Sequence, residues 1–305
     1  MFCVFEIKSV SLRKISSQKN FAMKTKLILF AVAWAVSLAA NAGKVLTDSI
    51  VSKTLNATVK YNVYLPDGFD RTDKKYPVVY LLHGLYGGYE DWAKNASMQA
   101  VADELIASGE ADEMVVIMPN AGHHDIHNHW NGYFNMPGWS YEDFFFNELI
   151  PTAEAKYRGV ADKQHRAIMG LSMGGGGSTV YAQHHPDAFS SCYAMSAWLD
   201  SPAPGVDMPR DKFYYTCLSV HENSAVGFAE NATPEQVAQL RSVKWMFDCG
   251  DDDGLMELSV KIHTALRKKR VNSELRINNG VHNWEYWHLA LRKALPFASR
   301  NFGTR

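Results

Sequence analysis

The sequence predicts an α/β protein in which a mostly parallel central sheet is flanked by helices. Short apolar runs alternate along the chain with segments of helical periodicity, the order that parallel strands and crossover helices produce. The later runs lack alternating polar residues, as expected for strands covered on both faces. We find no internal repeat, low-complexity tract or interdomain linker after residue 42. About 260 residues then remain, which suits a single domain over 43–305.

The apolar runs predict where the strands lie along the chain. The first strands are expected between Val45 and Leu65, where polar residues separate apolar ones, and Pro66-Asp67-Gly68 should turn the chain. Further strands are expected at 76–82, 114–118, 166–171, 189–195, 244–249 and 273–277.

Apolar residues recur at helical spacing in four segments, and we expect helices at 98–108, 141–157, 255–270 and 284–295. Ser140 is the expected N-cap of the second helix, with Glu142 and Asp143 in its first turn. Residues 201–240 are rich in Pro, Asp and Asn and lie between two core strands. We expect this segment to be irregular and to form a lid or side insertion over the site.

Residues 1–42 are expected to be a leader outside the fold. A short basic segment at 23–26 precedes an apolar run from Leu27 to Ala40, and Ala40-Asn41-Ala42 has the spacing of a cleavage site. The apolar run is short for a membrane span. We therefore expect a signal peptide cut after Ala42, and a secreted or periplasmic chain without a membrane anchor.

The mature chain is acidic and contains three cysteines. Residues 43–305 carry a net charge of −6 with histidine neutral, which argues against nucleic acid or an anionic membrane as a partner. Cys192, Cys217 and Cys249 show no CxxC spacing, so neither a zinc knuckle nor a disulfide framework is indicated. Two alternatives stay open, a single Cys217–Cys249 bridge or three buried thiols.

The stretch 166–177 contains the candidate nucleophile. An apolar run leads into Gly170-Leu171-Ser172-Met173-Gly174, and further glycines follow. In a nucleophile elbow, a buried strand ends in a sharp turn whose serine is strained and exposed, and a helix begins directly after it. Gly170 and Gly174 would leave room for that close packing. This pattern makes Ser172 the expected nucleophile.

A serine nucleophile needs a base, and the base needs an acid that orients it. Two later strands each end in a suitable turn. His282 follows the last strand in a Gly-x-His-x-Trp turn, which makes it the expected base. Cys249-Gly250 runs into three adjacent carboxylates, of which Asp253 is the preferred acid, with Asp252 and then Asp251 as alternatives.

The oxyanion hole needs two backbone N–H donors. One is expected from Met173, which follows the nucleophile. The other is expected from the glycine-rich loop after strand 76–82, with Leu85 preferred and Gly84 as the alternative.

Four motifs together resemble the esterase D-like family, which includes feruloyl and acetyl-xylan esterases, S-formylglutathione hydrolases and mycolyltransferases. The motifs are Tyr-Pro-Val-Val-Tyr-Leu-Leu-His-Gly (76–84), Gly-Leu-Ser-Met-Gly-Gly (170–175), Cys-Gly-x-x-Asp (249–253) and Gly-x-His-x-Trp-x-x-Trp (280–287). The resemblance implies an α/β-hydrolase fold and serine esterase activity without a metal or cofactor. It assigns the roles of nucleophile, base and acid to Ser172, His282 and Asp253, and the oxyanion hole to Leu85 and Met173.

Aromatic side chains are frequent near the expected site, and sugar rings and aromatic acyl groups both stack on such surfaces. We expect a short acyl or hydroxycinnamoyl ester of a plant polysaccharide or oligosaccharide as substrate. The candidates for contact with it are His83, Trp92, His124 and Trp284.

Three other functions stay open on the sequence. The same chemistry could transfer the acyl group to a sugar instead of water. The histidine cluster at 123–129 could hold zinc in a metal-dependent hydrolase, although it follows a strand as a loop and lacks the helical frame in which metal hydrolases place His-x-x-x-His. The third possible function is carbohydrate binding without catalysis. The complete set of Ser172, His282 and Asp253 argues against it.

Overall fold

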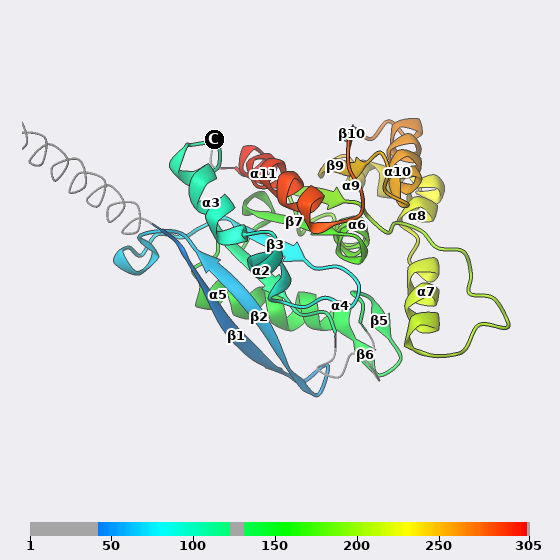
Figure 1. Cartoon of the computed structure of the whole chain (residues 1–305), viewed down its shortest axis with the longest axis horizontal. Coiled ribbons are helices and arrows are strands. Elements are labelled where there is room, and N and C mark those ends of the chain that lie inside the picture. The colour runs from blue at the N-terminus through cyan, green and yellow to red at the C-terminus, as the bar shows by residue number, and fades with distance from the viewer. Residues whose placement is uncertain (1–41, 123–130, 304–305) are drawn as a thin grey trace, which may run out of the picture. The chain divides into compact units, whose positions relative to one another are not determined.

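The computed structural model describes residues 42–122 and 131–303, and one eight-stranded sheet runs through them (Figure 1). The strand order across the sheet is β1-β2-β4-β3-β7-β8-β9-β10. β1 and β2 form an antiparallel hairpin, and β2 is also antiparallel to β4. All other neighbours are parallel, so the sheet is mostly parallel, as predicted. The strands are β1 (Lys44–Ser52), β2 (Ala57–Leu65), β3 (Val78–Leu82), β4 (Val115–Pro119), β7 (Arg166–Leu171), β8 (Ser191–Met195), β9 (Lys244–Gly250) and β10 (Ser273–Asn278).

Helices cover both faces of this sheet, because the parallel strands are apolar on both sides. Along β3, Tyr80 and Leu82 belong to one buried cluster, and Val79 and Leu81 belong to the other. α3 and α11 pack in the second cluster, and α5, α6, α8, α9 and α10 pack in the first. The helices are α2 (Asp91–Asn95), α3 (Met98–Ala107), α4 (Tyr141–Phe144), α5 (Ile150–Lys156), α6 (Met173–His184), α7 (Lys212–Glu222), α8 (Ala225–Asn231), α9 (Pro234–Leu240), α10 (Met256–Lys268) and α11 (Trp284–Arg300).

The expected strands and helices are present with small shifts at their ends. The helix expected at 141–157 is interrupted by a π-helical turn at Phe145–Leu149, between α4 and α5. Ser140 is the N-cap residue of α4, as predicted, although its side chain forms no capping hydrogen bond. The short helix α2 and the small hairpin of β5 (Asn135–Met136) and β6 (Trp139–Ser140) were not predicted from the sequence. Within the described residues, no helix is both long and apolar enough to cross a bilayer.

Residues 201–240 were expected to be irregular, and this was wrong, since they contain α7, α8 and α9. Side-chain caps start each helix. Asp211 accepts hydrogen bonds from the backbone N–H groups of Phe213 and Tyr214. Thr233 and Gln236 form a reciprocal capping box at α9. Asp211, one of the polar residues that suggested a loop, is therefore the N-terminal cap of a helix.

The three cysteines of the described chain are buried free thiols. The alternative of a bridge between Cys217 and Cys249 is therefore wrong, and the alternative of buried thiols is correct.

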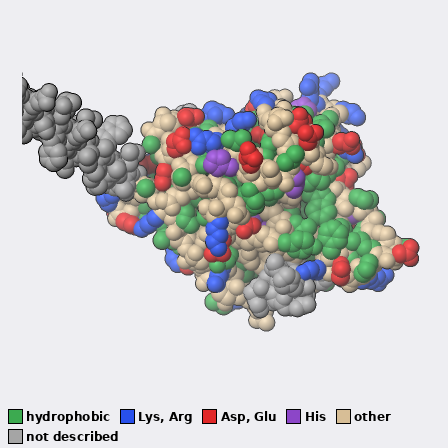
Figure 2. All heavy atoms as spheres, viewed as in Figure 1, with side chains coloured by type: hydrophobic (Ala, Val, Ile, Leu, Met, Phe, Trp, Pro, Cys, Tyr) green, Lys and Arg blue, Asp and Glu red, His purple; other side chains and the backbone are tan. Residues whose placement is uncertain are grey.

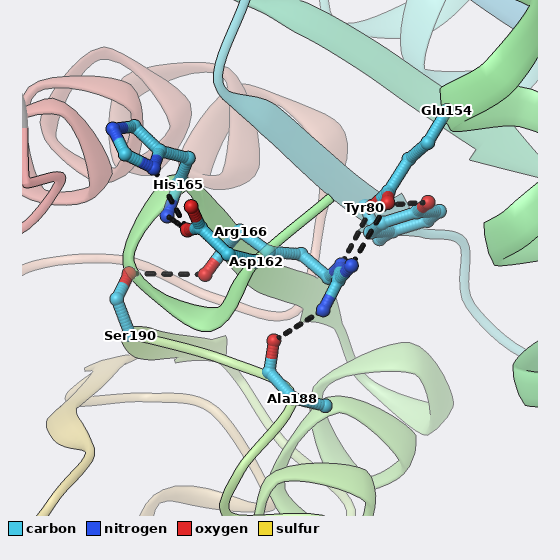
Figure 3. A network of polar contacts seen from close by, with 7 residues as sticks. All are labelled: Tyr80, Glu154, Asp162, His165, Arg166, Ala188 and Ser190. Carbon is cyan, nitrogen blue, oxygen red and sulfur yellow. Dashed lines mark hydrogen bonds and ion pairs between the residues drawn. The ribbon is translucent and has the colours of Figure 1, made fainter. Parts of the chain in front are cut away.

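A buried ion pair joins β7, the strand that leads to Ser172, to α5 (Figure 3). The Arg166 guanidinium donates through Nε to Glu154 Oε1 at 2.6 Å and through Nη2 to Oε2 at 2.8 Å. Its Nη1 donates to the Ala188 carbonyl at 2.8 Å, and the Tyr80 hydroxyl donates to Glu154 Oε1 at 3.2 Å. Only 3% of the Glu154 side chain is exposed, so its charge is balanced by Arg166 and not by water.

We predict that Glu154→Gln lowers the free energy of unfolding by about 3–5 kcal/mol, because it leaves the Arg166 guanidinium buried without its counter-charge. Urea denaturation of both proteins measures the difference. Glu90→Gln is the matched control. It breaks a pair with Lys94 in which the side chains of Glu90 and Lys94 are 45% and 63% exposed, and its effect should be far smaller because water screens the two charges. Equal losses in the two variants would contradict this view of the buried pair.

Candidate active site

Ser172 stands in the sharp turn between β7 and α6. Its φ and ψ angles are 53° and −119°, a conformation that L residues rarely adopt. Backbone hydrogen bonds hold the turn. The Ser172 N–H donates to the Met195 carbonyl at 2.9 Å, and the Ser172 carbonyl accepts from the N–H groups of Gly176 and Trp198. The geometry is that of a nucleophile elbow.

The glycines around the turn allow α6 to approach the sheet closely. A Cβ on Gly174 would lie 2.5 Å from the His83 carbonyl oxygen and 2.6 Å from that of Leu82. A Cβ on Gly176 would lie 2.1 Å from the Trp198 carbonyl oxygen. These neighbours are backbone atoms, which cannot move aside as a flexible side chain could. The helix can therefore begin at this place only with glycine at these positions.

His282 and Asp253 lie in line with the serine. The distance from Ser172 Oγ to His282 Nε2 is 3.1 Å, and the distance from His282 Nδ1 to Asp253 Oδ2 is 2.8 Å. The Asp253 side chain is fully buried, and its Oδ1 accepts a hydrogen bond from the Leu255 N–H at 2.9 Å. Burial alone would raise the pKa of Asp253, but the hydrogen bonds from His282 and Leu255 outweigh burial and hold the pKa below its usual value.

The structure distinguishes the three adjacent carboxylates. Asp251 and Asp252 are exposed, whereas Asp253 is buried against His282. Asp251 Oδ1 accepts a hydrogen bond from the Gly280 N–H at 2.9 Å, and the Asp252 N–H donates to the Gly280 carbonyl at 3.1 Å. These two residues therefore tie the acidic turn to the loop that carries the histidine.

The loop after β3 lies against the elbow. A Cβ on Gly84 would be 2.7 Å from Leu171 Cδ1 and 3.6 Å from Ser172 Cβ. The Gly87 N–H donates to the Gly84 carbonyl, which makes Leu85 the second residue of a turn. Met173 is the first residue of α6, where an N–H has no acceptor within its own helix. Both backbone groups thus come from segments next to Ser172.

The residues expected to touch a substrate have different surroundings. His83 is buried, its Nδ1 donates to the Gly84 carbonyl, and its Nε2 accepts from the Ala121 N–H. Burial lowers the pKa of His83, in keeping with a neutral ring that accepts a hydrogen bond. Trp92 is also buried, and its indole donates to the Leu82 carbonyl. These two residues support the loop after β3, and in this structure neither presents a free polar group.

Trp284 is partly buried and packs edge-on against both Trp92 and Trp287. Trp287 in turn packs edge-on against the His282 ring. His124, and the cluster at 123–129 that could hold zinc, lie outside the described residues.

This fold, with a serine elbow that meets a histidine and a buried carboxylate, defines a class of protein: the serine hydrolases of the α/β type. A family model described as "Putative esterase" matches residues 52–298, and the chain belongs to this esterase family. The four sequence motifs suggested the same family.

Three similar proteins give this result more detail. A solved structure titled "ferulic acid esterase" is 48% identical with a TM-score of 0.83, and the match covers 86% of this chain and all of that one. An endo-1,4-beta-xylanase/feruloyl esterase of Xylanibacter ruminicola is 26% identical over 76% of this chain, which spans only 28% of that relative. The mycolyltransferase Ag85B of Mycolicibacterium smegmatis is 24% identical over 74% of this chain and 77% of its own length.

We predict that Gly174→Ala reduces esterase activity by about 100-fold, because the added methyl group pushes α6 away from β3 and displaces Ser172. Steady-state rates on p-nitrophenyl acetate measure the loss, and circular dichroism checks the fold. Gly205→Ala is the control, since no heavy atom lies within 4 Å of its added Cβ. Wild-type activity in Gly174→Ala would show that the close approach is not required.

Proposed function

We propose that the chain hydrolyses short acyl or hydroxycinnamoyl esters of plant polysaccharides or oligosaccharides. In this proposal Ser172 is the nucleophile, His282 the general base and Asp253 the acid that orients it. The observation that carries the proposal is the hydrogen-bonded line from Ser172 Oγ through His282 to Asp253, at 3.1 and 2.8 Å.

The reaction follows from this line. His282 Nε2 takes the Ser172 proton as Oγ forms a bond to the ester carbonyl carbon. The carbonyl oxygen becomes an oxyanion, which the Leu85 and Met173 N–H groups stabilise. The bond to the alcohol oxygen then breaks, and His282 gives its proton to that oxygen. Water repeats the steps on the acyl-enzyme and releases the acid.

Asp253 stabilises the imidazolium that forms in each step. Its low pKa keeps it ionised, and its bond to Nδ1 leaves Nε2 free to face the serine.

An apolar surface beside the site suits an aromatic acyl group. Tyr86 follows Leu85 directly and is 47% exposed, and Phe213 on α7 is 40% exposed. The Lys212 ammonium lies 5.5 Å from the centre of the Tyr86 ring, so α7 stands next to the loop after β3. Figure 2 shows hydrophobic side chains gathered over this part of the molecule. We propose that α7 makes residues 201–240 a side wall of the site.

The similar proteins favour the same substrate class. The names "ferulic acid esterase" and "endo-1,4-beta-xylanase/feruloyl esterase" both refer to hydroxycinnamoyl esters. The same proposal includes a signal peptide over 1–42 and secretion of the chain. A secreted enzyme would meet plant polysaccharides outside the cell.

Acyl transfer is the alternative that a specific observation supports. The Ag85B relative is named an acyltransferase and aligns over most of its own length. The acyl-enzyme is common to both reactions, and only the acceptor differs. Chromatography of products formed with and without an added oligosaccharide alcohol separates them, because transfer gives a new ester and hydrolysis gives free acid.

We predict that Ser172→Ala lowers kcat on p-nitrophenyl acetate and on methyl ferulate by at least about 10³-fold, because no other group supplies the nucleophile. Ser49→Ala, at an exposed position of β1, is the control and should keep the wild-type rate. Equal rates for Ser172→Ala and wild type would contradict the proposal. Activity on p-nitrophenyl acetate with none on methyl ferulate or feruloylated xylan would leave the nucleophile in place and contradict the hydroxycinnamoyl substrate.

A further inference from the structure

A pocket lies beside helix α11, away from the catalytic line. Its volume is about 360 Å³, which is enough for a small molecule. Met246 lines it from β9 and Glu274 from β10, each four residues before the end of its strand. Strands rise ~3.3 Å per residue, so the pocket lies roughly 13 Å from the sheet edge where Ser172, Asp253 and His282 meet.

The pocket exists because α11 covers only part of one face of the sheet. α11 packs across β7 and β8, whereas α10 packs on β9 and β10 from the other face. The strand register places Tyr193, Met246 and Glu274 in one row across β8, β9 and β10. Their side chains therefore point to the face that α11 covers. The row begins under the helix and ends in the open, where Glu274 is exposed.

The floor of the pocket is apolar. Tyr193 and Phe297 pack edge-on, with ring centres 5.5 Å apart, and Met246 and Pro296 lie beside them in the lining. The Tyr193 hydroxyl already donates to Asp248 Oδ2 at 2.5 Å. The floor therefore offers an occupant rings and hydrocarbon and no free hydroxyl, which favours a ligand with an apolar body.

The rim of the pocket is cationic. Lys293 and Arg300 lie seven residues apart in α11, so they share one side of the helix, on either side of Pro296 and Phe297. Both side chains are exposed, and neither forms an ion pair with any residue that the structure describes. Two cations thus stand over an apolar floor without a counter-charge of their own.

The other charges of the rim are largely balanced. Arg276 Nη2 lies 2.9 Å from Glu274 Oε2, and Arg292 Nη1 donates to Glu104 Oε2 at 2.9 Å. Glu110 is the remaining carboxylate of the lining. Once these groups are paired, one positive charge is left over at the rim, which suits a ligand that carries a single negative charge.

We propose that this pocket is a second binding site, and that its ligand is a carboxylate with an aromatic body, for which cinnamate is the simplest probe. The ring covers the floor, and the carboxylate lies within reach of the Lys293 and Arg300 side chains. Phosphate would leave the floor uncovered, and a neutral ring would leave the two cations without a partner. The reaction proposed above releases an acid of this class, but the site follows from its lining and does not depend on that reaction.

Lys293→Gln/Arg300→Gln tests the charge at the rim. Isothermal titration with cinnamate measures the Kd, which should rise at least about tenfold when both charge-assisted contacts are lost. Lys53→Gln/Lys60→Gln is the matched control, because it removes two exposed lysines elsewhere and changes the net charge equally. It should keep the wild-type Kd. Equal Kd values for the two double variants would overturn the proposal.

Chemical protection tests where cinnamate binds. At ~2 times the Kd, cinnamate should slow reductive methylation of Lys293 about threefold by mass action, while Lys60 reacts as before. Mass spectrometry of the peptides measures both rates. Cinnamyl alcohol has the ring without the charge, and phosphate has charge without the ring. Lys293 unprotected by cinnamate would overturn the site, and equal protection by either of the other two probes would overturn the ligand class.

The outcomes separate this inference from the proposed function. Lys293 and Arg300 lie outside the catalytic line, so their double variant should keep the wild-type kcat and KM on p-nitrophenyl acetate. Cinnamate bound at the catalytic line would inhibit this hydrolysis equally in both double variants, which distinguishes it from cinnamate bound in the pocket. Full activity in Ser172→Ala would overturn the proposed function and leave the pocket untouched, whereas an unprotected Lys293 would do the reverse.

Discussion

The Ser172 hydroxyl reaches His282 because helix α6 begins in contact with strand β3. Gly174 lies so close to the carbonyls of Leu82 and His83 that no Cβ would fit. This contact fixes where the helix starts, and the start of the helix sets the strained backbone of Ser172. Strain of this kind persists only where the surrounding structure holds it, and here hydrogen bonds from Gly176 and Trp198 do so.

The parallel sheet then brings the rest of the site to the same edge. Ser172, Asp253 and His282 follow β7, β9 and β10, and parallel strands end on one side of a sheet. The loops after β9 and β10 are also tied to each other, because Asp251 and Asp252 both bond to Gly280. The short distances at the site thus depend on backbone geometry.

Much of this could be predicted from the sequence, and the reasons are physical. Buried strands need apolar runs, and the elbow needs glycines, so the strands and the positions of the motifs along the chain could be predicted. The choice of Asp253 over Asp251 and Asp252 depended on spacing, and the structure brings Asp253 to His282. Residues 201–240 were misjudged because Asp211 and Thr233 cap helices there, and caps share their composition with loops.

Other features could not be predicted, since they depend on three-dimensional contacts. Ser196 belongs to no motif, and its left-handed backbone and its hydrogen bond to Trp287 are visible only in the structure. His83 and Trp92 were expected to face a substrate, but burial turns both toward backbone carbonyls. A single sequence does not show which aromatic rings the core encloses.

The most direct test of the central claim is to label the protein with a fluorophosphonate, which reacts with an activated serine, and to map the adduct by mass spectrometry. The account predicts one adduct per chain, on the peptide that contains Ser172, and none in His282→Ala, where the base is missing. An adduct on another serine, or equal labelling of His282→Ala, would contradict it.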